Sequence, residues 1–261
     1  MTLFFHELKK NRISLIIWTA AICFMLGVTV LIYPEMTGQM SEMENIFAEM
    51  GAFSEAFGMD RINFGEFIGY FGIECGNVLG IGGALFAAIT GVIALSCEES
   101  HHTAEFLLSH PLSRKKIVAL KLVSAIAQIV ILNLLVMGVV FALTSIIIDN
   151  PPFKTMLLIF LAYFILQLEI SLICFGISAF VSNSAMGIGI GVGFGFYMIN
   201  IISNLTDDLK FLKYITPFSY AESADIITNK SLEIKYLAVG LAFAVIGLVA
   251  AFIKYTKKDI S

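Results

Sequence analysis

The reactive side chains of this sequence gather in residues 98–121, which hold three of its four histidines and three of its glutamates. A metal site there would draw its ligands from His101, His102, Glu105 and His110. Adjacent helical residues point about 100° apart, so neighbouring histidines on a helix do not face the same ion. The sequence also lacks the H-E-x-x-H motif and the cysteine–histidine spacing of structural zinc sites. We therefore expect no metal site.

The same stretch contains no complete catalytic motif. Glu98-Glu99 begins the Glu-Glu-x-x-x-Arg pattern of CAAX-type membrane proteases, but Thr103 stands where arginine is needed. Serine–histidine catalysis of the hydrolase type needs a strand-to-helix elbow, which nothing here predicts. No Gly-Lys dipeptide occurs in the chain, so there is no Walker A loop to hold ATP phosphates. These features predict a protein that is not an enzyme and binds no cofactor itself.

Polar side chains inside long apolar runs form a second group of candidates: Glu74, Glu169 and Asn200. Charged groups within a bilayer usually face a cavity or a partner. Glu74 lies 23 residues before Cys97, about 35 Å along a helix, so we expect it near the outer interface and in water. Glu169 lies near the middle of its run. Two interpretations stay open for it: a place on a substrate pathway, or a structural hydrogen bond to Gln128 or Asn133.

The elements that must position these residues are membrane-spanning helices. Charged residues make up 14% of the chain and hydrophobic residues 58%, a balance that excludes soluble and disordered chains. A helix needs about 20 apolar residues to cross a bilayer. Six runs are close to or above that length: residues 13–33, 75–97, 122–148, 155–181, 185–203 and 236–253. We predict an all-α membrane protein with six transmembrane helices, forming a single domain over residues 1–261.

Lysine and arginine are unevenly distributed over the regions that connect these runs. Residues 1–12, 98–121 and 254–261 hold ten of the 16 basic residues with five acidic ones, whereas the opposite side holds six basic and 13 acidic residues. Basic residues mark the cytoplasmic side, so both termini are expected in the cytoplasm. Residues 2–12 are expected to form a short amphipathic helix in the inner interface, before the first span.

The first outer loop predicts an amphipathic helix outside the membrane. Its apolar residues recur every three or four positions, as on one face of a helix: Met36, Met40, Met43, Phe47, Met50, Phe53 and Phe57. Glutamates fall between them, and Gly58 is placed to end the helix. Two interpretations stay open. The stripe packs on its own bundle or on the bilayer, or it forms an adaptable contact surface for a hydrophobic ligand.

Two features of the later spans bear on packing. Gly187, Gly191 and Gly195 recur at the small-xxx-small spacing that lets a second helix approach closely, from the same chain or from a second subunit. Residues 204–235 form an outer segment in which Thr216-Pro217 should break any helix. We expect two short helical pieces that flank a turn there and dip toward the bundle in a re-entrant manner.

The polar stretch also has the spacing of a known family. Its pattern is Glu99-x-x-x-Thr103-x-Glu105-x-Leu107-Leu108-Ser109-x-Pro111-Leu112-Ser113-Arg114-x-x-Ile117-x-x-x-Lys121. This closely resembles the cytoplasmic loop of type 2 ATP-binding-cassette permeases, the membrane subunits of exporters, with His102-Thr103 in place of the usual Gly-Thr. Ile215-Thr216-Pro217-Phe218 and the terminal Lys257-Lys258-Asp259-Ile260 agree as well, so the resemblance covers the whole chain.

The resemblance implies a role for the loop and a set of partners. The residues that would couple the chain to an ATPase are Glu99, Thr103, Glu105, Leu107, Leu108, Pro111 and Arg114. Two cytosolic ATPase subunits, which carry ATP and Mg²⁺, and a second permease subunit would complete an exporter in a bacterial cell membrane, with lipid but no nucleic acid as a further partner. The expected substrate is hydrophobic or amphipathic: a peptide toxin, an antimicrobial peptide or a drug. The alternative is a secondary carrier or channel that needs no ATPase and uses Glu169 for coupling.

Overall fold

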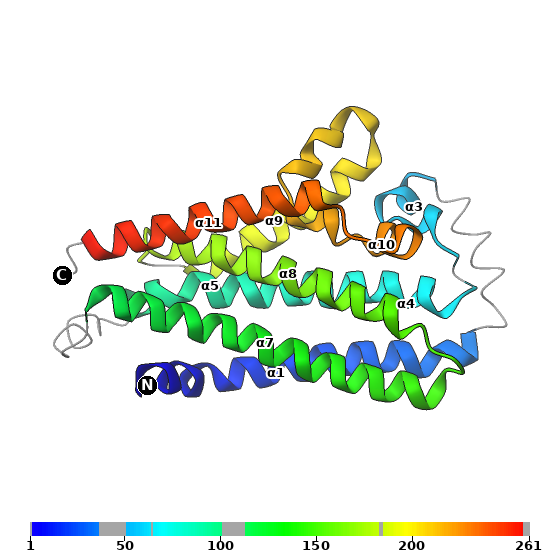
Figure 1. Cartoon of the computed structure of the whole chain (residues 1–261), viewed down its shortest axis with the longest axis horizontal. Helices are drawn as coiled ribbons and strands as arrows, with labels where there is room; N and C mark the ends of the chain where they lie inside the picture. The colour runs from blue at the N-terminus through cyan, green and yellow to red at the C-terminus, as the bar shows by residue number, and fades with distance from the viewer. Residues whose placement is uncertain (1, 37–50, 64, 101–112, 183–184, 258–261) are drawn as a thin grey trace.

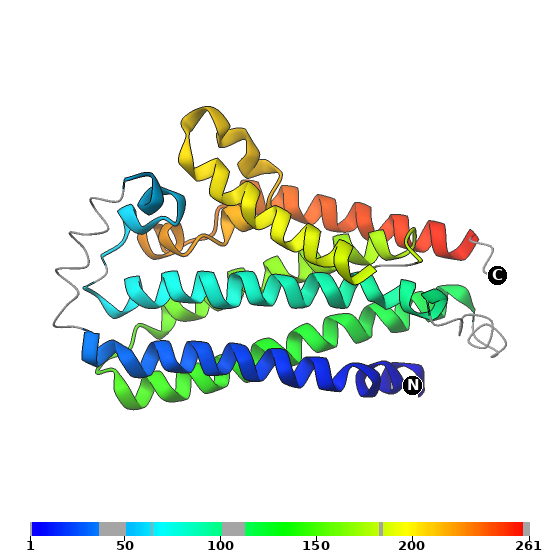
Figure 2. The same cartoon turned by 180° about the vertical axis from the view of Figure 1, so that it is seen from behind.

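The chain forms an elongated bundle of helices that run side by side (Figure 1 and Figure 2). The computed structural model describes residues 2–36, 51–63, 65–100, 113–182 and 185–257, and these residues contain helices and no strand. Within them, six stretches are long and apolar enough to cross a membrane: Leu3–Met36, Phe67–Glu98, Arg114–Ile147, Phe153–Ser178, Ala185–Leu205 and Ile234–Lys257. The predicted all-α fold with six spans is confirmed.

The first span is longer than its apolar run. Helix α1 extends without interruption over Thr2–Met36, so the helix expected at residues 2–12 is present and continues directly into the first span. Its position in the inner interface stays a prediction. The 35 residues of α1 cover about 52 Å at about 1.5 Å each, more than the roughly 30 Å of a hydrocarbon core. The polar residues of its first turns therefore continue the helix beyond the apolar part.

The second span consists of three consecutive helical stretches and lies at the centre of the bundle. Helix α4 (Phe67–Cys75) passes into a π-helical stretch, η2 (Gly76–Gly82), and then into α5 (Gly83–Ser100). Glycines in η2 leave room for Tyr163 of α8 (Phe153–Ser178), because a Cβ atom on Gly80 would lie only 3.0 Å from Tyr163 Cε1. This span is the most deeply buried of the six.

The remaining spans pack around this centre. Helix α7 (Arg114–Ile147) lies along α1, α9 (Ala185–Leu205) along α5, and α11 (Ile234–Lys257) along α8. A small apolar cluster, separate from the main core, lies at one end: Leu3, Leu95, Ile117, Val118, Phe175, Ala179, Ala251 and Tyr255. The first and last described residues lie at this end (Figure 1). We name it the inner end, after the predicted orientation, and the opposite end the outer end.

The outer end carries short helices from two segments. Helices α3 (Ala52–Ala56) and η1 (Met59–Arg61) precede the second span, and η3 (Asp207–Tyr214), η4 (Pro217–Tyr220) and α10 (Ser223–Asn229) precede the sixth. Thr216 has an extended backbone and its hydroxyl accepts the Phe218 N–H, so Pro217 begins η4 at a position where its missing N–H costs nothing. All four residues of η4 are buried. The segment turns in toward the bundle as expected, with three short helices instead of two.

The amphipathic helix predicted for residues 36–57 is wrong in its last part. Met36 is the final residue of α1, and Gly51 has φ 48° and ψ −115°, outside the helical region. The rings of Phe53 and Phe57, 4.8 Å apart, therefore follow this break and accompany α3. Gly58 has φ 68° and ends this segment, as the sequence predicts. Four members of the stripe lie outside the described residues: Met40, Met43, Phe47 and Met50.

Candidate functional site

The predicted coupling loop departs from two helix ends at the inner end of the bundle. Helix α5 ends at Ser100, with Glu99 in its last turn. Helix α7 begins at Arg114, after Ser113, whose hydroxyl accepts the Lys116 N–H at 3.4 Å. The other predicted coupling residues lie outside the described part of the chain: Thr103, Glu105, Leu107, Leu108 and Pro111.

Three helices meet at a buried lysine beside these helix ends. The side chain of Lys121 in α7 is 0% exposed, and its Nζ lies 2.7 Å from Glu7 Oε1 of α1 and 2.9 Å from Glu98 Oε1 of α5. Lys10 lies at the periphery, where its Nζ donates to Cys97 Sγ at 2.9 Å and lies 3.5 Å from Glu98 Oε1. We name Glu7, Glu98 and Lys121 the inner ion-pair cluster. Sequence reasoning placed Lys121 in the loop motif and missed this contact, because a motif does not show which helix faces meet.

Glu169 is buried in α8 and faces the outer segment. Its Oε2 accepts a hydrogen bond from the Tyr220 hydroxyl of η4 at 2.8 Å, whereas its Oε1 has no partner among the described residues. The backbone of Gly240 in α11 lies so close to this carboxylate that a Cβ atom would collide with it. Tyr220 and Gly240 were not selected from the sequence. The Ile215–Phe218 motif, which lies just before Tyr220, is the sequence feature that could have drawn attention to this contact.

Asn133, one of the two partners expected for Glu169, forms a hydrogen bond with the Gln167 amide instead. Asn133 Nδ2 of α7 donates to Gln167 Oε1 of α8 at 2.6 Å, and Gln167 is fully buried. A helix turns about 100° per residue, so residues 167 and 169 point about 200° apart and only one of them faces α7. The interpretation in which Glu169 bonds to Gln128 or Asn133 is therefore wrong. Its place on a pathway stays a prediction.

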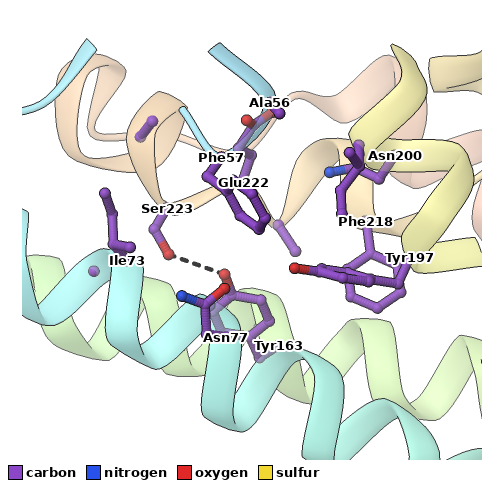
Figure 3. Close-up of a pocket in the computed structure, with 15 residues that line it drawn as sticks. Ala56, Phe57, Ile73, Asn77, Tyr163, Tyr197, Asn200, Phe218, Glu222 and Ser223 are labelled. Carbon is purple, nitrogen blue, oxygen red and sulfur yellow. Dashed lines mark hydrogen bonds between the residues drawn. The ribbon is translucent and has the colours of Figure 1, made fainter. Parts of the chain in front are cut away.

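A small cavity of about 60 Å³ lies at the outer end between α4, α8, α9 and the segment before α11 (Figure 3). Tyr163 and Ser223 share a hydrogen bond of 2.9 Å at its wall, and the Tyr197 hydroxyl points into it. Asn200 lines the cavity, and its buried Oδ1 has no partner among the described residues. A cavity of this size holds a few waters, at about 15 Å³ each, which would satisfy that oxygen.

Glu74 lies next in the chain to residues that line this cavity, but among the described residues it forms no polar contacts like those of Tyr163 and Ser223. It is partly buried in α4, one residue before the buried Cys75. No hydrogen bond or ion pair joins it to the residues that the structure describes. Its expected exposure to water is therefore only partial within this chain.

Four charged side chains join the outer segments beside the cavity. Arg61 Nη2 lies 2.6 Å from Glu222 Oε1, and Arg61 Nη1 lies 2.6 Å from Asp225 Oδ1. Lys213 Nζ lies 3.9 Å from Glu222 Oε2. Burial raises the pKa of Glu222, while the adjacent Arg61 and Lys213 oppose the rise. We name these four residues the outer ion-pair cluster. Its two cations balance its two anions, so it supplies no excess charge to attract an ion into the cavity.

Helix α9 presents its glycines on two faces. A Cβ atom on Gly189 would lie 2.7 Å from Val92 Cγ1, and one on Gly193 would lie 3.3 Å from Leu85 Cδ2, so these two glycines pack on α5. A Cβ atom on Gly187, Gly191 or Gly195 would meet none of the described atoms within 4 Å. The stripe predicted for close packing therefore faces away from the described part of this chain.

These features agree with a comparison of the chain with known families. Residues 1–260 match the family model described as ABC-2 family transporter protein. The chain belongs to this family, and it is a multi-pass membrane permease of an ABC transporter. Such permeases are the membrane components, and their ATPase is a separate subunit. A search of curated proteins found no match to the chain.

Proposed function

We propose that this chain is the permease subunit of an exporter that moves a hydrophobic or amphipathic substrate out of a bacterial cell. Peptide toxins, antimicrobial peptides and drugs fit this class. The observation that carries the proposal is the match of residues 1–260 to ABC-2 transporters, together with a coupling motif between α5 and α7. Partnership with an ATP-binding subunit argues against the alternative of a secondary carrier or channel.

The inner end is the proposed docking surface for two cytosolic ATPase subunits. The helix ends that precede and follow residues 101–112 lie at the end where basic residues are in excess, which favours a cytoplasmic position for the loop. Leu107 and Leu108 supply the apolar face of the proposed coupling helix. ATP and Mg²⁺ bind to the partner, because the sequence of this chain lacks a Walker A loop.

The open face of α9 is the proposed contact with a second permease subunit, identical or related. Gly187, Gly191 and Gly195 leave this face flat over two turns, which favours close approach of another helix. Large apolar side chains flank the stripe, and Met186, Ile190 and Phe194 are 57%, 42% and 48% exposed. This exposure supports pairing at a face that the described chain leaves uncovered.

The proposed substrate class follows from apolar spans and an acidic outer side. Glu74, Glu169 and Asn200 are the proposed polar points of a largely apolar path. The outer regions hold 13 acidic against six basic residues, which would draw a cationic amphipathic peptide away from the exit. Salt would weaken this attraction, because exposed charges are screened.

Replacing both Leu107 and Leu108 with aspartate tests the docking surface. Two carboxylates forced into an apolar groove cost several kcal/mol, so ATPase binding should weaken by at least about 100-fold. Co-purification with the ATPase and export of a fluorophore-labelled cationic amphipathic peptide from proteoliposomes should both be lost, with membrane insertion unchanged. ATP turnover should require the added ATPase.

The matched control for this double variant is His110→Asp, which adds a charge at an unspecified position of the same motif and should keep both activities. Normal co-purification and full export in the Leu107→Asp/Leu108→Asp variant would overturn the docking assignment. Turnover of ATP by the purified permease alone would overturn the proposal that only the partner subunit hydrolyses ATP.

A further inference from the structure

The inner ion-pair cluster joins three helices that are far apart in the chain. Glu7 and Lys121 are 114 residues apart, yet their charged atoms lie 2.7 Å from each other inside the bundle. Glu98, the second acid on Lys121, lies two residues before the end of α5. The start of α1, the end of α5 and the start of α7 all lie at the inner end of the bundle (Figure 1 and Figure 2).

We propose that the inner ion-pair cluster ties α1 to both helix ends of the coupling loop, so that these three helix ends move as one body when the ATPase closes. This inference rests on the proposed function. The loop between Ser100 and Ser113 is continuous with α5 and α7 alone, so a displacement of the loop reaches these two helices through the backbone. Among charged contacts in the described residues, α1 joins the same unit through the buried Glu7 at 2.7 Å, and through the longer, partly exposed contact of Lys10 with Glu98 at 3.5 Å.

The position of the cluster relative to the loop suits this role. Lys121 lies seven residues after Arg114, about 10 Å along α7 from the point where the loop rejoins the bundle. Glu98 lies two residues before Ser100, about 3 Å along α5 from the point where the loop departs. A displacement of either end of the loop therefore moves a helix end that lies close to the Lys121 ion pairs.

The packing around the cluster also marks the inner end as a unit of its own. Leu3 of α1, Leu95 of α5 and Ile117 of α7 belong to an apolar cluster separate from the main core. Apolar contacts hold these helix ends together but are non-directional. Two short ion pairs with buried atoms add a fixed geometry, so the helix ends keep their register when they are displaced.

Buried ion pairs are weak evidence for stability, because the cost of removing charges from water offsets their attraction. A neutral replacement of similar shape is often tolerated, whereas removing one partner leaves an unpaired buried charge. A role in positioning therefore makes a distinct prediction: neutralising all three groups together should spare the fold and abolish the coupled movement.

The experiment compares hydrogen exchange in the permease–ATPase complex, in lipid nanodiscs, with and without ATP trapped by vanadate. In the wild type, trapping should change deuterium uptake in residues 2–12 and in residues 113–121 together. In E7Q/E98Q/K121M, the change in residues 113–121 should remain and the change in residues 2–12 should be lost. Lys10→Met is the matched control, because Lys10 is 30% exposed and lies at the edge of the cluster. It should behave as the wild type does.

The outcomes separate this inference from the proposed function. If the wild-type chain does not bind the ATPase, the proposed function fails. If it binds, but the triple variant keeps the change in residues 2–12, or the wild type shows none there, the inference alone is overturned. If the triple variant does not reach the membrane, E7K/E98Q/K121E replaces it, with Glu98 neutralised so that it does not repel the new acid at position 121. This exchange keeps opposite charges on α1 and α7 and should restore the response that E98Q/K121E loses.

Discussion

Glu169 is the residue whose environment makes the sharpest test of the buried polar contacts. Replacing Gly240 with alanine should lower the melting temperature of the purified protein in detergent, because the new methyl group takes space that the Glu169 carboxylate occupies. Overpacking of a tight interior costs about 1–3 kcal/mol. In G240A/E169A the carboxylate is gone, so most of this cost should vanish. A double-mutant cycle measures that coupling.

Gly187→Ala is the matched control for Gly240→Ala. The same methyl group on Gly187 meets none of the described atoms within 4 Å, and alanine is the better helix former by about 0.5–1 kcal/mol. Its melting temperature should stay equal or rise slightly. Equal melting temperatures for the two single variants would contradict the contact between Glu169 and α11.

The same residues show what one sequence can and cannot predict about a site. Helical periodicity predicts that Gln167 and Glu169 face opposite sides of α8, since they are about 200° apart. It does not predict which of them faces Asn133, because the rotation of a helix about its axis depends on packing with all its neighbours. The contact of Tyr220 with Glu169 could not be predicted from the sequence for a further reason. It joins residues 51 positions apart, and Tyr220 lies in a short buried helix.

Among the elements, the short outer helices depend on Arg61, which joins segments 161 residues apart. Arg61→Ala removes the cation nearest to Glu222 and Asp225 and should lower the free energy of unfolding. We expect a loss of about 1–3 kcal/mol, less than for a fully buried pair, because the Arg61 side chain is 34% exposed. Thermal unfolding in detergent measures this loss.

The loss in Arg61→Ala should depend on pH. Burial already raises the pKa of Glu222, and removing Arg61 raises it further. At pH values below the raised pKa, Glu222 is neutral and has little need of a cation, so the loss should be smaller. It should grow as pH increases through that pKa. Lys235→Ala is the control, because the Lys235–Glu233 ion pair is largely exposed and should contribute almost nothing. A loss that is the same at all pH values would contradict the role assigned to Glu222.

A helix could be predicted from the sequence where a single property, such as the length of an apolar run, determines that it forms. Hydrophobic runs of membrane length were enough to predict six spans, whereas their ends were not, because α1 continues through polar residues down to Thr2. The rule that proline interrupts helices correctly predicted the break between η3 and η4, but not that Pro217 itself begins η4, in the first turn, where proline is accepted. Apolar spacing alone missed the break at Gly51, whose positive φ depends on how the chain must turn.

For the whole molecule, the two glycine faces of α9 separate folding from assembly. Gly189 and Gly193 pack on α5 of the same chain, so larger side chains there must displace Val92, Leu85 or the Ala88 backbone. Gly187, Gly191 and Gly195 lie on the open face, which we propose for a second permease. Variants of the two faces should therefore fail in different ways.

Replacing Gly187, Gly191 and Gly195 with leucine should leave the fold of each chain intact and abolish pairing. The Cβ atoms of the leucines meet open space within the described chain, and the leucine side chains hold a neighbouring helix away from the close approach that small residues permit. Native mass spectrometry from lipid nanodiscs should show single permeases in place of pairs, with an unchanged melting temperature in detergent. In the control G189L/G193L, leucine side chains collide with α5, so the melting temperature itself should drop. If the first variant still pairs as the wild type does, the second subunit packs on another face, because three leucines along the stripe exclude a closely packed helix there.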